Sequence, residues 1–120
     1  MKHVIKPALS IATLIALSAL ITSAPARAGV SGFVLVNGTD ARLSAVAIRR
    51  VGTDGWQPLG ASPSAGASQA IKFSDRDCAF DIRAQSGGKP VTWAGINLCD
   101  VKSVTLKSDS AGSWVDYDAP

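Results

Sequence analysis

Apolar and polar residues alternate most regularly over residues 78–85. The apolar positions of this stretch are Cys78, Phe80, Ile82 and Ala84, and the positions between them are Ala79, Asp81, Arg83 and Gln85. Successive side chains of a β-strand point to opposite faces of the sheet, whereas a helix would spread these apolar positions around its circumference. The pattern therefore predicts a strand whose apolar positions face inward and whose Asp81 and Arg83 face outward.

Shorter β-like segments follow one another along the rest of the chain. The segments rich in strand-forming residues are 33–36, 43–50, 70–73, 91–98, 101–107 and 113–117. Turn-forming residues lie between them, and Gly60–Ser68 has the small residues of a flexible loop. About seven short strands with no helix between them predict an all-β domain, either a small antiparallel β-sandwich of Ig-like type or a barrel.

The dipeptide Asn37-Gly38 is a strong local turn signal. Both residue types adopt the positive φ angles of a tight hairpin, so the sequence predicts a turn joining residues 33–36 to residues 43–50. Asn37-Gly38-Thr39 also matches an N-glycosylation sequon. We favour the turn, because it explains from local structure why Asn and Gly occur together at this point.

The first 28 residues have the pattern of a signal peptide. A short basic segment precedes an apolar run from Ala8 to Ile21, and Ala26-Arg27-Ala28 is a small-x-small cleavage pattern. The apolar run is too short for a membrane anchor, which needs about 20 residues. We expect cleavage after Ala28, a single domain over residues 29–120, a periplasmic or secreted location, and no membrane contact after cleavage.

Cys78 and Cys99 are the only two cysteines, and one opens a predicted strand while the other closes one. Exported proteins form and keep disulfides. We therefore predict a Cys78–Cys99 disulfide that joins two strands of a domain too small to be stabilised strongly by its core alone.

Composition excludes several classes of function. Lys2, Lys6 and Arg27 lie in the predicted signal, so residues 29–120 carry nine Lys and Arg against nine Asp, for a formal net charge of zero. A nucleic-acid binder would carry a basic field. Residues 29–120 also contain no His, Met or Glu, which excludes His-based catalytic triads and the common zinc, copper and haem sites. We expect no enzyme; the alternative is an Asp-dependent enzyme, for example with Asp77 and Lys72 or with Tyr117 and Asp116.

Two pairs of aspartates could hold a hard cation. Asp75 and Asp77, and likewise Asp116 and Asp118, are two residues apart and would share a face of an extended chain. Calcium prefers such oxygen ligands, but neither pair belongs to a calcium-loop motif, and aspartates are also common in turns. We expect no cofactor, with calcium as the alternative.

The remaining candidates are aromatic and charged side chains for contact with a partner. Trp56 lies between two turn sequences and is the aromatic most expected to be exposed, whereas Trp93, close to Cys99, is expected in the core. Asp81 and Arg83 are expected to form an exposed ion pair on the outward face of their strand. The partner would be a protein or a glycan.

Several segments together resemble a group of small exported, mostly uncharacterised proteobacterial proteins. They are FVLVNGT, LSAVAIRRVGTDGW, DCAFDIRAQ, WAGINLCDVKSVTL and WVDYD, which cover nearly all of residues 29–120. The resemblance implies no activity, cofactor or catalytic residue. Some members of that group bear an argininosuccinate lyase label, but the helical bundle and signature loop of that enzyme have no counterpart here. The sequence thus predicts a non-catalytic binding or structural module, with a carbohydrate-binding or inhibitor-like module as the alternative.

Overall fold

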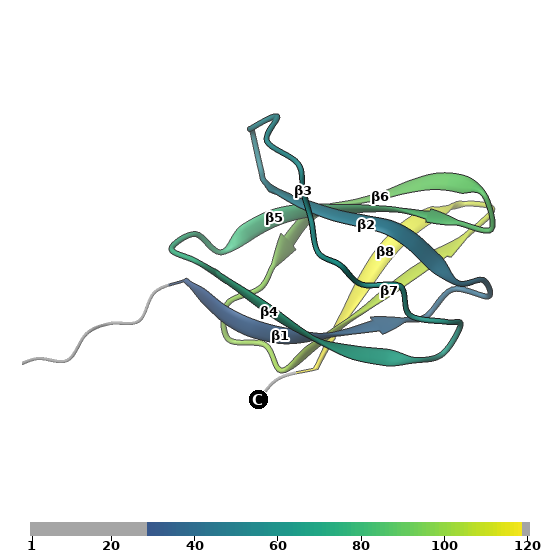
Figure 1. Ribbon diagram of the computed structural model, residues 1–120, viewed down its shortest axis with the longest axis horizontal. Coiled ribbons are helices and arrows are strands. Elements are labelled where there is room, and N and C mark those ends of the chain that lie inside the picture. Colours follow the sequence, from purple (N-terminus) through teal and green to yellow (C-terminus); the bar gives the residue numbers. More distant parts are fainter. Residues whose placement is uncertain (1–28, 119–120) are drawn as a thin grey trace, which may run out of the picture.

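Eight β-strands make up the computed structural model of the protein, which describes residues 29–118 (Figure 1). The strands are β1 (Val30–Asn37), β2 (Leu43–Arg50), β3 (Gln57–Pro58), β4 (Ser68–Asp75), β5 (Ala79–Ser86), β6 (Lys89–Asn97), β7 (Ser103–Asp109) and β8 (Gly112–Asp118). No helix that could cross a membrane occurs in this part of the chain. The predicted signal peptide, residues 1–28, lies outside the described residues.

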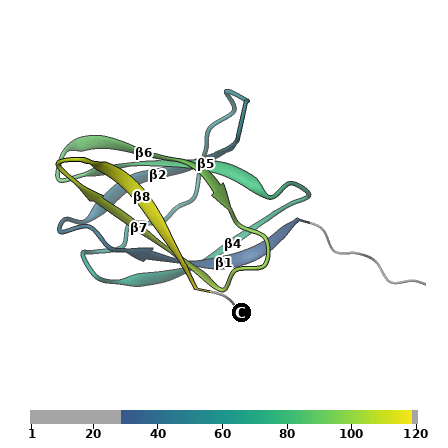
Figure 2. The same ribbon diagram turned by 180° about the vertical axis from the view of Figure 1, so that it is seen from behind.

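The strands form two four-stranded sheets that pack face to face, which confirms the sandwich and excludes the barrel (Figures 1 and 2). The first sheet has the order β4-β1-β7-β8 and the second has the order β3-β2-β5-β6. One pair departs from the antiparallel pattern, because β1 and β7 run parallel, from Val34 opposite Ser103 to Asn37 opposite Leu106. Parallel neighbours need a long connection, and here five strands intervene in sequence.

The predicted hairpin at Asn37-Gly38 is wrong. β1 belongs to the first sheet and β2 to the second, so the chain crosses between the sheets at this point. Gly38 does not adopt a positive φ. Glycine fits here because of close packing: a Cβ atom at Gly38 would lie 2.7 Å from Cγ2 of Thr105 and 3.0 Å from the carbonyl oxygen of Leu106.

Asn37 is instead the centre of a buried hydrogen-bond network. Its side chain is fully buried, and its Nδ2 donates to the carbonyl oxygens of Ala41 at 2.7 Å and Pro63 at 3.0 Å. Its Oδ1 accepts from the backbone N–H of Thr39 at 2.9 Å and from the Thr39 hydroxyl at 2.6 Å. The amide nitrogen that a glycan would modify is therefore occupied and enclosed in the folded domain.

Apolar side chains from both sheets fill the space between them. The largest fully buried hydrophobic residues are Trp93, Phe80, Leu35, Leu43, Ile48, Ile82, Ile96, Leu98, Leu106 and Val104. The indole Nε1–H of Trp93 on β6 donates to the carbonyl oxygen of Lys107 on β7 at 2.8 Å, so this side chain links the two sheets. The prediction that Trp93 belongs to the core is confirmed.

The predicted disulfide between Cys78 and Cys99 is present, with the two Cα atoms 5.2 Å apart. Cys78 immediately precedes β5, and Cys99 follows Leu98 beyond the end of β6. The backbone N–H of Leu98 donates to the carbonyl oxygen of Cys78 at 2.9 Å, so the disulfide extends the β5–β6 pairing. Both cysteines are only partly buried, which corrects the expectation that Cys78 lies in the core.

Candidate binding surface

Two irregularities shape the outward face of the second sheet. The β2–β5 register shifts between Ser44 and Ala47, where Ala45 adopts a φ of 50°. The β5–β6 register shifts between Phe80 and Ile82, opposite Gly95, whose φ is 66°. Such β-bulges bend a strand and redirect its side chains and backbone groups.

Asp81 lies on this outward face, as predicted, but it is buried, with only 5% of its surface exposed. Its Oδ1 accepts the backbone N–H of Gly95 at 2.9 Å, and its Oδ2 accepts Nε of Arg49 at 2.9 Å. The prediction of an exposed Asp81–Arg83 ion pair is therefore wrong. Arg49 is the direct cross-strand partner of Asp81, whereas residues two apart along one strand are separated by about 6.6 Å.

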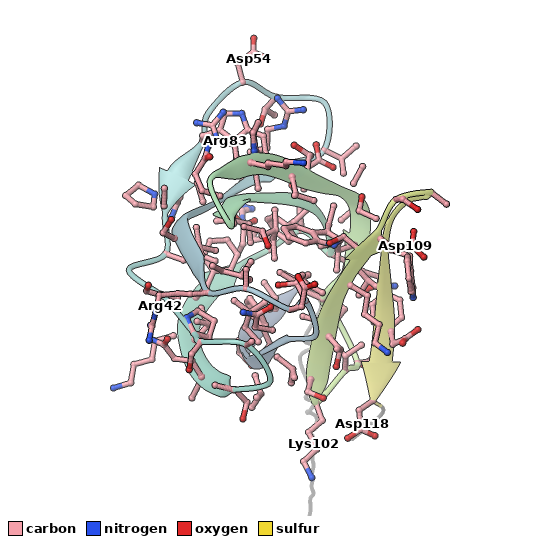
Figure 3. The ribbon with its side chains drawn as sticks, turned by 90° about the vertical axis from the view of Figure 1, so that its right-hand side faces the viewer. Arg42, Asp54, Arg83, Lys102, Asp109 and Asp118 are labelled. Atoms are coloured by element: carbon pink, nitrogen blue, oxygen red, sulfur yellow. A yellow bond between two sulfur atoms is a disulfide. The ribbon has the colours of Figure 1, made fainter. Side chains whose placement is uncertain are left out.

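Trp56, the residue before β3, is half-buried over the same face. The guanidinium carbon of Arg83 lies 4.3 Å from the centroid of its ring, and that of Arg49 lies 4.5 Å from it. Figure 3 shows Arg83 beneath the loop that carries Asp54. The structure thus brings together the three predicted contact residues Trp56, Asp81 and Arg83, and adds Arg49, which the sequence did not single out.

The two arginines differ in their charge environment. Arg49 has two carboxylate partners, Asp81 at 2.9 Å and the exposed Asp54 at 3.9 Å. Arg83 is exposed, and within residues 29–118 no carboxylate lies at ion-pair distance from it. The positive charge on this surface is therefore concentrated at Arg83.

Two neighbouring cavities extend from this cluster, one of about 370 Å³ and one of about 260 Å³. The first is lined by Ala45, Val46, Ala47, Trp56, Pro58, Gly60, Ala61, Ser62 and Arg83, and the second by Ala45, Arg83, Ala84, Gln85, Pro90 and Thr92. Ala45 and Arg83 line both, so the cavities form one depression, which we call the trough. It crosses the second sheet from β3 to β6.

The exposed aromatics are not where the sequence placed them. Trp114 is 43% exposed and Tyr117 is 49% exposed, both on the edge strand β8. Side chains alternate between the two faces of β8, so Trp114 shares a face with Asp116, and Val115 shares the other face with Tyr117. The polar neighbour Asp116 was a signal in the sequence that Trp114 faces outward. The Tyr117 hydroxyl accepts the backbone N–H of Asn97 on β6 at 3.0 Å.

The first pair of candidate cation ligands is occupied by a guanidinium group. Nη2 of Arg50 lies 3.1 Å from Asp75, and its Nε lies 3.1 Å from Asp77. The pKa of Asp75 is lowered, first by the hydrogen bond that its carboxylate accepts from the backbone N–H of Asp77 and then by Arg50, against the effect of burial. The protein itself thus neutralises one of the two negative charges of this pair.

The second pair, Asp116 and Asp118, extends along the exposed edge strand β8. Asp116 pairs with Nζ of Lys107 at 3.6 Å. No group of three or more His, Cys, Asp or Glu side chains that could hold a metal ion occurs among residues 29–118. Tyr117 and Asp116, one of the alternative enzyme pairs, are adjacent in a strand and therefore point to opposite faces.

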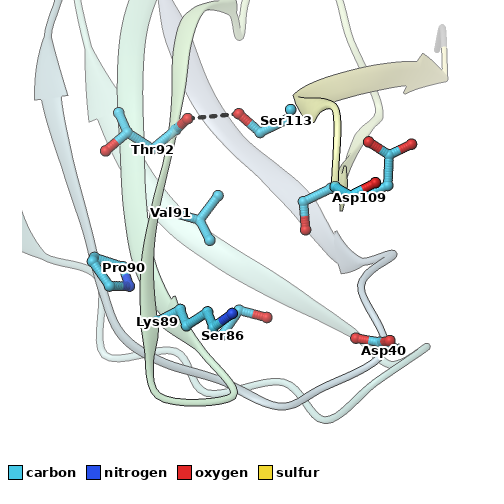
Figure 4. A pocket seen from close by; sticks show the side chains of 11 residues that line it. Asp40, Ser86, Lys89, Pro90, Val91, Thr92, Asp109 and Ser113 are labelled. Atoms are coloured by element: carbon cyan, nitrogen blue, oxygen red, sulfur yellow. Dashed lines mark hydrogen bonds between the residues drawn. The ribbon is translucent and has the colours of Figure 1, made fainter.

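A second depression, of about 590 Å³, lies between β6 and the β7–β8 hairpin (Figure 4). Its lining is mainly polar and comprises Asp40, Ser86, Lys89, Pro90, Val91, Thr92, Ser108, Asp109, Ser110, Gly112 and Ser113. The Ser113 hydroxyl donates to the carbonyl oxygen of Thr92 at 2.9 Å across it. Its exposed charges have both signs, and none of its lining residues is aromatic, so it does not favour one class of ligand.

Comparisons of the chain with protein-family models, with curated proteins and with solved structures give no match.

Proposed function

We propose that the protein is an exported, non-catalytic binding module and that the trough is its binding surface. The observation that carries the proposal is the unpaired guanidinium group of Arg83, which lies 4.3 Å from the Trp56 ring at the junction of two cavities. Tryptophan and arginine are the residue types that most often dominate binding energy at interfaces. An arginine already ordered on an indole loses less side-chain entropy when a ligand binds.

The trough fits this role better than the polar depression of Figure 4. Its first cavity is lined mainly by small apolar groups of Ala45, Ala47 and Pro58, which can release water on contact with an apolar ligand. The net charge of the trough is positive, because Asp81 and Asp54 neutralise Arg49 whereas none of the described carboxylates pairs with Arg83. An apolar floor with one oriented polar group is typical of ligand sites.

A periplasmic or extracellular location is part of the proposal. The predicted signal peptide and the Cys78–Cys99 disulfide both support it, since disulfides persist in oxidising compartments. Intact-mass measurement of the protein recovered from the periplasm of a Gram-negative host is expected to give a chain that begins at Gly29 and gains two hydrogens on reduction. A chain that retains the first 28 residues, or free thiols in the untreated protein, would contradict this part.

Photo-crosslinking in living cells tests the binding surface. A photoreactive phenylalanine derivative replaces Pro58 or Gln85, which line the trough and not the polar depression, and in a control replaces Ala70, an exposed residue of β4 in the other sheet. We expect adducts from the two trough positions and few from Ala70. Equal yields from all three positions, or none from the trough, would refute the proposed surface and favour a purely structural module.

A glycan-binding surface around Trp114 is the second candidate. The ring is 43% exposed, and exposed indoles stack on sugar rings. Trp56 is less suited, because two guanidinium groups already contact its ring. Quenching of tryptophan fluorescence by chitin or cellulose oligosaccharides that is lost in W114A and kept in W56A would support this candidate; an unchanged spectrum would exclude it for those sugars.

A further inference from the structure

We infer that the trough binds an extended peptide segment in which apolar side chains flank a carboxylate, and that Arg83 holds the carboxylate. The inference rests on the proposed function and names the partner of the same surface. It follows from the length of the trough, the chemistry of its floor and the position of its one unpaired charge.

The length of the trough suits a short extended segment. Its lining residues come in order from β3, β2, β5 and β6, for example Pro58, Ala45, Arg83 and Thr92. Crossing four strands covers three spacings of about 4.8 Å each, or about 14 Å. An extended chain advances about 3.4 Å per residue, so the trough accommodates about four residues.

The floor of the trough is small and mainly apolar. Ala45 and Ala47 contribute methyl groups from β2, and Gly60 and Ala61 contribute little bulk beside them. Ala45 lines both cavities and has a positive φ of 50°, which is uncommon for a residue with a Cβ atom. Backbone outliers of this kind cluster at functional sites. The bulge at Ala45 leaves a continuous shallow floor on which aliphatic side chains can rest.

The charge of the trough selects an anionic group. No lining residue of either cavity is acidic, and Arg83 lines both. Its guanidinium carbon lies 4.3 Å from the centroid of the Trp56 ring. No carboxylate of the described residues pairs with Arg83, and a guanidinium group that stacks on an aromatic ring can still form a bidentate bond to a carboxylate through the N–H groups at its edge. A neutral sugar would leave this charge without a partner.

Two matched pools of five-residue peptides test the inference against the exported, disulfide-bonded protein. All peptides are acetylated and amidated, and their four outer positions carry Ala, Val, Leu or Thr. The central residue is Glu in one pool and Gln in the other. Binding is followed by changes in the amide signals of Ala45 and Ala47 and in the Nε–H signal of Arg83 in proton–nitrogen NMR spectra.

We expect the Glu pool to shift these signals and to bind about tenfold more tightly than the Gln pool, as the loss of one charge-assisted bond predicts. R83Q is expected to lose about the same factor. R76Q removes the same charge from an exposed arginine that does not line the trough, and it is expected to bind like the wild type. Thermal unfolding checks that both variants fold.

Equal binding of the two pools, equal losses in R83Q and R76Q, or no shift with either pool would overturn the inference. Shifts of the same signals by chitohexaose but not by the Glu pool would overturn it in favour of a glycan. The proposed function is tested separately. If the peptides fail while crosslinks from Pro58 and Gln85 persist, only the peptide inference is wrong. If both fail, the binding surface itself is wrong.

Discussion

Replacing Asp81 by alanine tests the arrangement of the binding surface, because the structure and the sequence pattern assign this residue different partners. In the structure its carboxylate holds both Arg49 and the bulged backbone N–H of Gly95. In the sequence-based expectation it would form an exposed pair with Arg83. The two arrangements predict different losses of stability for D81A.

The magnitude follows from burial and from the number of bonds. The Asp81 side chain is 7% exposed and that of Arg49 is 28% exposed. A hydrogen bond to a charged group contributes about 1.5–3 kcal/mol. Water can reach both Arg49 and Gly95 once the carboxylate is gone, so the two losses do not add in full. We therefore expect D81A to lower the free energy of unfolding by about 1.5–3 kcal/mol in total. An exposed ion pair would contribute about 0.2–1 kcal/mol.

Double-mutant cycles measured by urea unfolding separate the two partners. We expect a coupling energy of about 1–2 kcal/mol between Asp81 and Arg49, in the range found for groups in contact, and below about 0.5 kcal/mol between Asp81 and Arg83. The cycle cancels the loss of the Arg49–Trp56 contact, which occurs in each variant that lacks Arg49. Equal couplings, or a larger coupling to Arg83, would refute the geometry described for this surface.

Three further predictions concern the scaffold. N37A is expected to lose about 2–5 kcal/mol in urea unfolding, because it leaves buried partners of the Asn37 amide unsatisfied. Replacing Cys78 and Cys99 by alanine, across a sequence separation of 21, is expected to lose about 3 kcal/mol by loop entropy. For Asp75, whose folded pKa is lowered, the stabilising effect is present above the ordinary aspartate pKa of about 3.9 and is lost as the pH falls through the folded value. The difference in unfolding free energy between the wild type and D75N is thus expected to be constant above about pH 5 and to shrink below about pH 4.

For each of these three predictions, a defined result would contradict the expected one. An N37A variant within about 0.5 kcal/mol of the wild type would show that its partners find other bonds. Unchanged stability of the alanine pair at Cys78 and Cys99 would show that β5–β6 pairing already restricts the unfolded chain. A wild-type–D75N difference that grows toward low pH would reverse the sign of the Asp75 linkage.

Period-two patterning predicted the local structure of the chain well. The alternation over residues 78–85 corresponds to β5, and the disulfide and the sandwich were both confirmed. These features depend on neighbours in sequence or on the two cysteines alone. The same reasoning placed Asp81 on the correct face, but it could not show that Arg49 and a bulge in β6 would bury it there.

The errors arose where long-range packing overrides a local signal. Asn37-Gly38 has the chemistry of a hairpin turn, yet Asn37 bonds to Pro63, which is 26 residues away, and Gly38 is needed for close contact with β7. Trp56 lies between turn sequences, yet the β2–β3 loop folds back and brings its ring onto Arg83. No pattern within a few residues of either position carries these contacts.

The most direct test of the account is the yield of crosslinked adducts from the photoreactive residue at position 58, compared between the wild type and W56A in living cells. If the trough is the binding surface and Trp56 orients Arg83 within it, the adducts present in the wild type will be lost or strongly reduced in W56A, while the control at position 70 stays unchanged. Adducts from position 58 that persist at full yield in a folded W56A protein would contradict the central claim.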